Sequence, residues 1–220
     1  MNWKSFGRVS VLSLALLSLV ALTNSCSSLY YSTYEKFGVY KRDLLKKRVA
    51  EARDDQQEAQ TQFKDALTRL KEITKFDGGE LERAYSSLKS EYDDCVSSAE
   101  SVRKRIRDVE TVAEDLFKEW DKEIGEISTP ALRDSSRQQL TATKERYNEL
   151  HRALVSAEGS MTPVLSQFKD YVLYLKHNLN AQAIASLKGE TTSIQNEINR
   201  LIEQMNSSIA RADEFIKTFK

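Results

Sequence analysis

Residues 81–127 read LERAYSSLKSEYDDCVSSAESVRKRIRDVETVAEDLFKEWDKEIGEI and contain no proline and a single glycine, Gly125. Apolar and small side chains recur in steps that almost always alternate between four and three residues, which is typical of the seam of a packed long helix. The seam positions are Leu81, Tyr85, Leu88, Tyr92, Cys95, Ala99, Val102, Ile106, Val109, Ala113, Leu116, Trp120, Ile124 and Ile127. A helix of this length extends about 70 Å and cannot bury its seam alone. The stretch therefore predicts partner helices elsewhere in the chain.

The composition of the 220-residue chain also favours long helices. Its 7 glycines and 2 prolines are far fewer than a loop-rich β protein contains. Lysine plus arginine and aspartate plus glutamate number 33 each, so the chain has no overall charge that would attract nucleic acid. We therefore expect an all-α protein with no nucleic-acid partner.

The first 25 residues have the layout of a secretory signal peptide. Lys4 and Arg8 give a positive start, residues 9–22 (VSVLSLALLSLVAL) are apolar apart from serines, and small polar residues follow. The apolar run is shorter than the roughly 20 residues that span a bilayer, which argues against a permanent transmembrane helix. We expect residues 1–25 to be removed on export.

Cys26 directly follows this segment, which makes the N-terminus resemble a bacterial lipoprotein signal. The resemblance implies that Cys26 is acylated and becomes the first residue of the mature protein, and Ser27 after it favours sorting to the outer membrane. Thr23 stands where such signals usually carry leucine, so Thr23-Asn24-Ser25 could instead be an ordinary cleavage site that releases a soluble periplasmic protein. Acyl chains on Cys26 would anchor the chain stably.

An aromatic patch and then a basic run follow the cysteine. The aromatic residues are Tyr30, Tyr31, Tyr34, Phe37 and Tyr40, and the basic residues are Lys41, Arg42, Lys46, Lys47 and Arg48. Aromatic rings settle at the headgroup level of a bilayer, and lysine and arginine are attracted to anionic lipids. The run thus predicts contact with a membrane surface, unless the aromatics cap the end of the helical body and the basic residues form a solvated face.

The remaining chain divides into long helices at residues 33–75, 80–127, 130–176 and 180–218. Asp77-Gly78-Gly79 marks the first turn, and Thr129-Pro130 marks the second, with proline at a first helical position. A seam resumes at Leu132. The third turn lies either at residues 159–163 or at residues 177–180, and the second choice gives four helices of matched length. We predict one domain, residues 26–220: an elongated antiparallel up-down four-helix bundle or coiled coil.

Constellations of catalytic residues are not found in the sequence. Di-metal bundles use Glu-x-x-His pairs, but Asn148 and Tyr174 stand three residues before the two histidines, His151 and His177. There is no nucleophile elbow, no Cys-x-x-Cys and no phosphate-binding loop. Cys95 lies on the seam and is read as a small buried apolar residue. We expect neither enzymatic activity nor a metal or cofactor.

Residues 170–187 (DYVLYLKHNLNAQAIASL) are less charged than the rest of the helical chain. His177, Asn178 and Asn180 stand there among apolar residues. A turn accounts for the asparagines, since asparagine tolerates turn conformations. The alternative is that these three residues contact a partner at one end of the bundle.

Several motifs resemble a known family. They are YY at 30–31, EKFGV at 35–39, KRD at 41–43, FDGG at 76–79 and LKHNLNA at 175–181. The chain thereby resembles proteobacterial lipoproteins with a long-helical coiled-coil body, a family defined by a domain of unknown function. The resemblance covers essentially the whole chain after Cys26 and implies export, a lipid anchor and a helical body. It implies no catalytic residue.

The sequence thus predicts a non-enzymatic, lipid-anchored envelope protein, held in the inner leaflet of the outer membrane and facing the periplasm, that serves as a helical scaffold or interaction module. One alternative is a membrane-binding or membrane-shaping helical module, for which the second basic run, Arg103 to Arg107, adds support. Another is a soluble periplasmic binding protein. Expected partners are the membrane and an envelope protein, and self-association into a homo-oligomer stays open.

Overall fold

The computed structural model describes residues 40–75 and 81–218. The chain divides into two units, Met1–Leu44 and Leu45–Lys220, and only residues 40–44 of the first unit are described. Several predictions fall outside the described residues: the signal peptide, the acylation of Cys26, and membrane contact by Tyr30, Tyr31 and Tyr34. Of the helices within the described ranges, none has the length and apolarity needed to cross a membrane.

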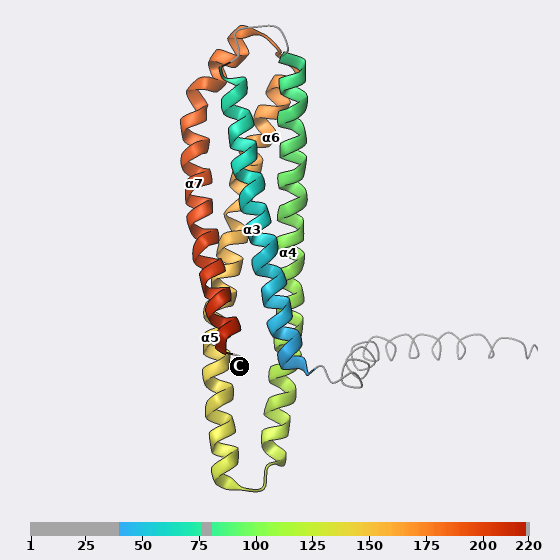
Figure 1. Cartoon of the computed structure of the whole chain (residues 1–220), viewed down its shortest axis with the longest axis vertical. Helices are drawn as coiled ribbons and strands as arrows, with labels where there is room; N and C mark the ends of the chain where they lie inside the picture. The colour runs from blue at the N-terminus through green and yellow to red at the C-terminus, as the bar shows by residue number, and fades with distance from the viewer. Residues whose placement is uncertain (1–39, 76–80, 219–220) are drawn as a thin grey trace, which may run out of the picture. The chain divides into compact units, whose positions relative to one another are not determined.

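The described chain is all-α, which confirms the predicted fold class. Its helices are α3 (Lys41–Ile73), α4 (Leu81–Glu126), α5 (Pro130–Gly159), α6 (Met161–His177) and α7 (Ala181–Thr218). In the second unit, α5 and α6 continue one another as a single rod, so that four antiparallel rods form the bundle (Figure 1).

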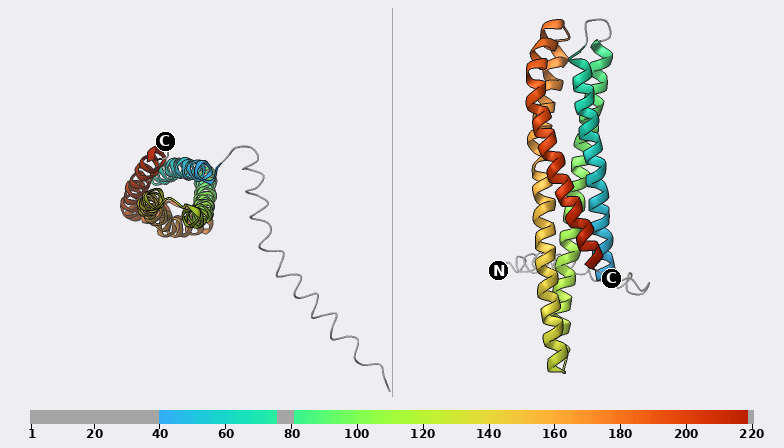
Figure 2. Two further views of the ribbon diagram at one scale, coloured as in Figure 1. Left: turned by 90° about the horizontal axis from the view of Figure 1, so that it is seen from below. Right: turned by 60° about the vertical axis from the view of Figure 1, so that its left-hand side comes forward.

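The four rods form a ring when the bundle is viewed from its end (Figure 2). Helix α4 packs against α5 and α6, and α7 packs against the same two helices. Hydrogen bonds join α3 to both of its neighbours: Arg53 donates to Asp213 of α7 at 2.8 Å, and Arg69 donates to Glu91 of α4 at 3.5 Å. The last bond places residue 69 of α3 level with residue 91 of α4.

The predicted third helix is divided at Ser160, but the chain does not reverse there. Ser160 has helical angles, φ −74° and ψ −14°, and its N–H still bonds the Ser156 carbonyl at 3.2 Å. Pro163 has no N–H to donate to the carbonyl of Gly159, four residues earlier, and this loss interrupts the helix. The reversal comes at residues 178–180, between α6 and α7.

The core follows the seams predicted from the sequence. Phe63, Phe168 and Leu154 are among the fully buried side chains, and Cys95 is a buried free thiol. Helix α3 contributes smaller groups: Ala52, Ala59 and Ala66 alternate along it with larger residues, and Gln56 takes one seam position. Burial of each large apolar side chain contributes about 1.5–3 kcal/mol, so the long seams supply most of the stabilisation.

The α4–α5 hairpin extends past the C-terminal end of α7 (Figure 1). Ile124 and Leu140 are buried between its two arms, whereas Leu132 is 62% exposed. The seam pattern predicts that Leu132 is buried, but its side chain is exposed in the structure. Helix α7 ends at Thr218, only three residues beyond Phe215, whose ring lies 6.4 Å from that of Tyr147. No part of α7 as described therefore reaches Leu132.

Candidate interaction site

Two asparagines build the turn that joins α6 to α7. The Asn178 side chain donates to the Tyr174 carbonyl at 2.9 Å, and its backbone N–H bonds the Leu175 carbonyl at 3.2 Å. The Asn180 side chain accepts from the Ala183 N–H at 3.0 Å, the geometry of a helix N-cap. Both asparagines predicted as partner contacts thus have structural roles that explain their presence.

Large apolar side chains are exposed beside this turn. Leu173 is 49% exposed and Tyr174 is 39% exposed on the last turns of α6, and Leu179 is exposed in the turn itself. His177 is exposed beside them. Exposed apolar residues that cluster together indicate an interaction site more strongly than scattered ones do. This end of the bundle, with Tyr174, His177 and Leu179, is the turn-end surface.

A groove between α4 and α6 lies next to the turn-end surface. Its volume is about 200 Å³, and it is lined by Tyr85, Lys89, Tyr92, Asp93, Lys169, Val172, Leu173 and Lys176. Lys89 forms an ion pair with Asp93. Within the described ranges, Lys169 and Lys176 face no carboxylate at ion-pair distance. The α4–α6 groove therefore has apolar and aromatic walls with a surplus of positive charge.

The groove residues were missed by reasoning from the sequence. The seam pattern predicts that Tyr85 and Tyr92 are buried, but both are only half-buried, and burial raises the pKa of the Tyr92 hydroxyl. The signal was present in the spacing: the two tyrosines are one heptad apart on α4, and Lys169 and Lys176 are one heptad apart on α6. Only the pairing of α4 with α6 shows that the two repeats share one groove.

The basic run at the start of α3 is partly engaged within the helix. Arg48 donates to Glu51 at 2.8 Å, and Lys47 lies 4.0 Å from the same carboxylate. Arg42 and Lys47 are exposed, while Lys41 and Lys46 are half-buried. The run thus presents fewer unpaired charges for anionic lipid than its sequence suggested.

Two arginines of the second basic run, residues 103–107, form ion pairs between helices, while Lys104 and Arg107 are exposed. Arg103 donates to Glu158 of α5 at 2.7 Å. Arg105 donates to Asp55 at 3.0 Å and to Glu51 at 3.2 Å, both on α3. These ion pairs link α4 to α5 and to α3. The support of the two arginines for a membrane-shaping module is correspondingly weakened.

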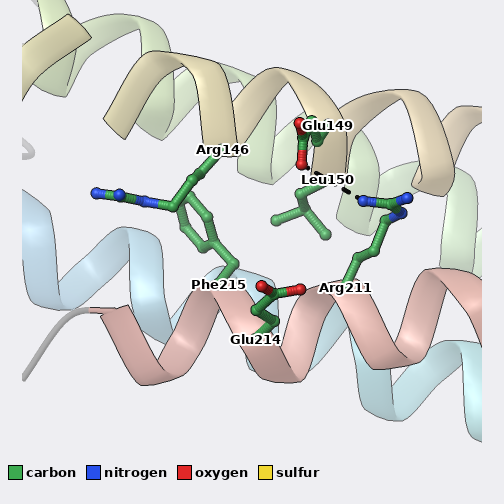
Figure 3. Close-up of a pocket in the computed structure, with 6 residues that line it drawn as sticks. All are labelled: Arg146, Glu149, Leu150, Arg211, Glu214 and Phe215. Atoms are coloured by element: carbon green, nitrogen blue, oxygen red, sulfur yellow. Dashed lines mark hydrogen bonds and ion pairs between the residues drawn. The ribbon is translucent and has the colours of Figure 1, made fainter. Parts of the chain in front are cut away.

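A small cavity between α5 and α7 brings charged side chains together (Figure 3). Arg211 donates to Glu149 at 3.4 Å across it, and Arg146 and Glu214 also line it. Its volume is about 30 Å³, enough for roughly one water molecule, and its charges balance. It is an electrostatic contact between rods and too small for an organic ligand.

Buried titratable side chains in the bundle are held in their neutral form. Burial raises the pKa of the Cys95 thiol to about 12 and that of Tyr171 to about 12. Neither residue lines the α4–α6 groove. A thiol that stays protonated at neutral pH is a poor nucleophile, so Cys95 acts as a packing group.

Over residues 40–75 and 81–218, no group of three histidine, cysteine or acidic side chains is arranged to hold a metal ion.

Comparison with known proteins identifies the family of the chain. The model of a family described as "Protein of unknown function (DUF2959)" matches residues 30–219. No curated protein and no solved structure matches the chain.

Proposed function

The chain belongs to this family of proteins of unknown function, and from its own sequence and surfaces we propose that it is a non-enzymatic cell-envelope protein. A lipid on Cys26 anchors it in the inner leaflet of the outer membrane. Its helical bundle faces the periplasm and acts as a scaffold that presents an interaction surface. The order of features along the chain supports this role: an export segment, a cysteine at its end, and then a bundle.

The turn-end surface is the proposed interaction surface. Tyr174 and Leu179 are exposed there, and His177 lies between them in the sequence. These exposed side chains lie at one end of the bundle, where a second envelope protein can reach them.

Cell fractionation of the Cys26→Ser variant tests the anchor. We expect the wild-type chain in the outer-membrane fraction with a triacylated N-terminal peptide by mass spectrometry. The variant should appear in the soluble periplasmic fraction, because serine cannot accept the thioether-linked lipid. An unmodified and uncleaved wild-type N-terminus would contradict the proposal.

Photo-crosslinking in intact cells tests the interaction surface. A photoreactive amino acid at Tyr174 should give a discrete adduct with an envelope protein. The matched control is the same group at Val155, which is 43% exposed on the middle of the rod, against 39% for Tyr174. Equal adducts from both positions would show that contact at the turn-end surface is not specific.

A further inference from the structure

We propose that the α4–α6 groove binds α3 of a second copy of this chain, so that the bundles associate side by side and point in the same direction. The proposal goes beyond the scaffold role and does not depend on the lipid anchor. It is based on three observations: the groove is positively charged, another rod carries a repeat of acidic residues, and the two surfaces lie at the same level along the bundle axis.

The groove carries positive charge that no carboxylate of the described residues neutralises. Lys169 and Lys176 are exposed on α6, one heptad apart, and no described carboxylate lies at ion-pair distance from either. Leu173 stands between them and is half exposed. An apolar residue flanked by lysines at heptad spacing is the pattern with which one helix receives another.

Helix α3 carries the complementary pattern on its surface. Glu58, Asp65 and Glu72 repeat at intervals of seven residues, and all three are exposed. Thr61 and Thr68 lie between them on the same stripe and offer methyl groups rather than bulky side chains. Glu72 bonds Arg69 at 2.8 Å, whereas Glu58 and Asp65 are not in an ion pair with any described residue. We name residues 58, 61, 65, 68 and 72 the acidic stripe.

The two patterns have the same period. Lysines seven residues apart on a helix are separated by about 10.5 Å, and so are acids seven residues apart. The acids of one helix can therefore meet both lysines of the groove at once when the helices run along each other. Opposite charges in this arrangement select the partner and its register.

The acidic stripe and the groove also lie at the same height on the bundle. Arg69 of α3 reaches Glu91 of α4, and the α4 wall of the groove runs from Tyr85 to Asp93. Asp65 and Glu72, on either side of Arg69, are thus level with the groove. Two copies that join these surfaces stand level with each other, an arrangement that copies held on one membrane can adopt.

The two surfaces differ, so the contact is heterologous. No α3 residue lines the groove, and one copy can therefore offer its stripe to one neighbour and its groove to another. Such a contact produces a ring when the rotation closes and an open row when it does not. Confinement of the copies to one surface would raise their effective concentration and favour the contact.

Zero-length carbodiimide crosslinking of the full chain tests the contact directly. Equal amounts of nitrogen-14 and nitrogen-15 chain are mixed, so that crosslinks between copies are recognised by mass. We expect mixed-isotope crosslinks from Lys169 or Lys176 to Asp65, Glu58 or Glu72. Their absence over the whole accessible concentration range, with a monomeric mass by light scattering, would overturn the proposal.

Charge reversal provides the second test. Lys169→Glu with Lys176→Glu gives a chain with two acidic surfaces, and Glu58→Lys with Asp65→Lys gives a chain with two basic surfaces. Each variant alone should lose the intermolecular crosslinks at least tenfold. A 1:1 mixture should recover them, because each groove then finds a stripe of opposite charge.

A matched control separates this contact from a general effect of charge. Lys104→Glu with Lys188→Glu changes the net charge equally at exposed positions outside the groove. This control should crosslink like the wild type, and circular dichroism should show that all variants keep their helices. Failure of the 1:1 mixture to recover crosslinks while both variants remain helical would overturn the proposed pairing.

Discussion

His151 of α5 and Glu110 of α4 meet at 2.5 Å between Nε2 and Oε1, where the ring of His151 also stacks on that of Tyr147. Tyr147 in turn packs edge-on against Phe117 of α4, with 5.4 Å between ring centroids. A polar and an aromatic contact thus join the same two rods within a few residues of each other.

His151→Ala is expected to lower the free energy of unfolding by about 1 kcal/mol, because both the hydrogen bond and the ring contact are lost. The value is small because both partners are about one-third exposed, and solvent weakens the bond. Urea denaturation measures it. His177→Ala, at the exposed C-terminal end of α6, serves as the control and should leave stability unchanged. Equal effects of the two substitutions would show that the His151–Glu110 contact contributes nothing.

Gln56→Leu is expected to stabilise the bundle by about 1 kcal/mol. The Gln56 side chain is fully buried, and neither its amide nitrogen nor its amide oxygen has a hydrogen-bond partner among the described residues. Leucine has a similar volume and removes the cost of burying unpaired polar atoms. Urea denaturation of the variant and of the exposed control Gln57→Leu measures the difference. A loss of stability would mean that the amide is hydrogen-bonded in solution.

Asn180→Ala is expected to cost about 1 kcal/mol of stability, since it removes the side-chain oxygen that caps α7. Asn180→Asp keeps an oxygen at the same place and should retain wild-type stability. Thermal denaturation compares the three chains. If the aspartate variant is as unstable as the alanine variant, capping is not the role of this residue.

Cys95 is expected to resist thiol reagents in the folded chain at pH 8. Burial raises its pKa to about 12, so the thiol stays protonated and enclosed. Denaturation should release one additional reactive thiol per chain, counted with a chromogenic disulfide. Reaction of Cys95 at the same rate in the folded and unfolded chain would contradict its burial.

The raised pKa of Cys95 also predicts a pH dependence of stability. An unfolded thiol ionises near pH 8.5, so ionisation favours the unfolded chain above that value. The stabilisation is fully present below about pH 8.5 and is lost as pH rises towards 12. Cys95→Ala should therefore show a shallower loss of stability between pH 9 and pH 11. Parallel curves for the two chains would contradict the shift.

The helices and their buried faces could be predicted because the seam repeats with a regular period. Leu88, Cys95 and Val102, one heptad apart, are all buried in the bundle. A period of 3.5 residues fixes one face of a helix from local sequence alone. It carries no information on where the partner helix ends, so the seam pattern predicts a buried Leu132 although α7 stops short of it.

The surfaces between helices could not be predicted in the same way. The sequence shows that residues 103–107 are basic, but not that Arg103 faces Glu158 or that Arg105 faces Glu51 and Asp55. Those pairings depend on the register between rods, which follows from the packing of all four. The same holds for the α4–α6 groove, whose two walls are about 80 residues apart in the chain.

Helix α4 runs for 46 residues without a break and forms one wall of both the α4–α6 groove and the α4–α5 hairpin. Because α4 is unbroken, its number of residues sets the distance between the two ends of the bundle. A whole heptad added to α4 would keep its seam on one face, but the rods that pack against it would need the same addition to keep both ends of the bundle in register. A single-residue insertion in α4 would rotate everything beyond it by about 100° and separate the two ends of each seam.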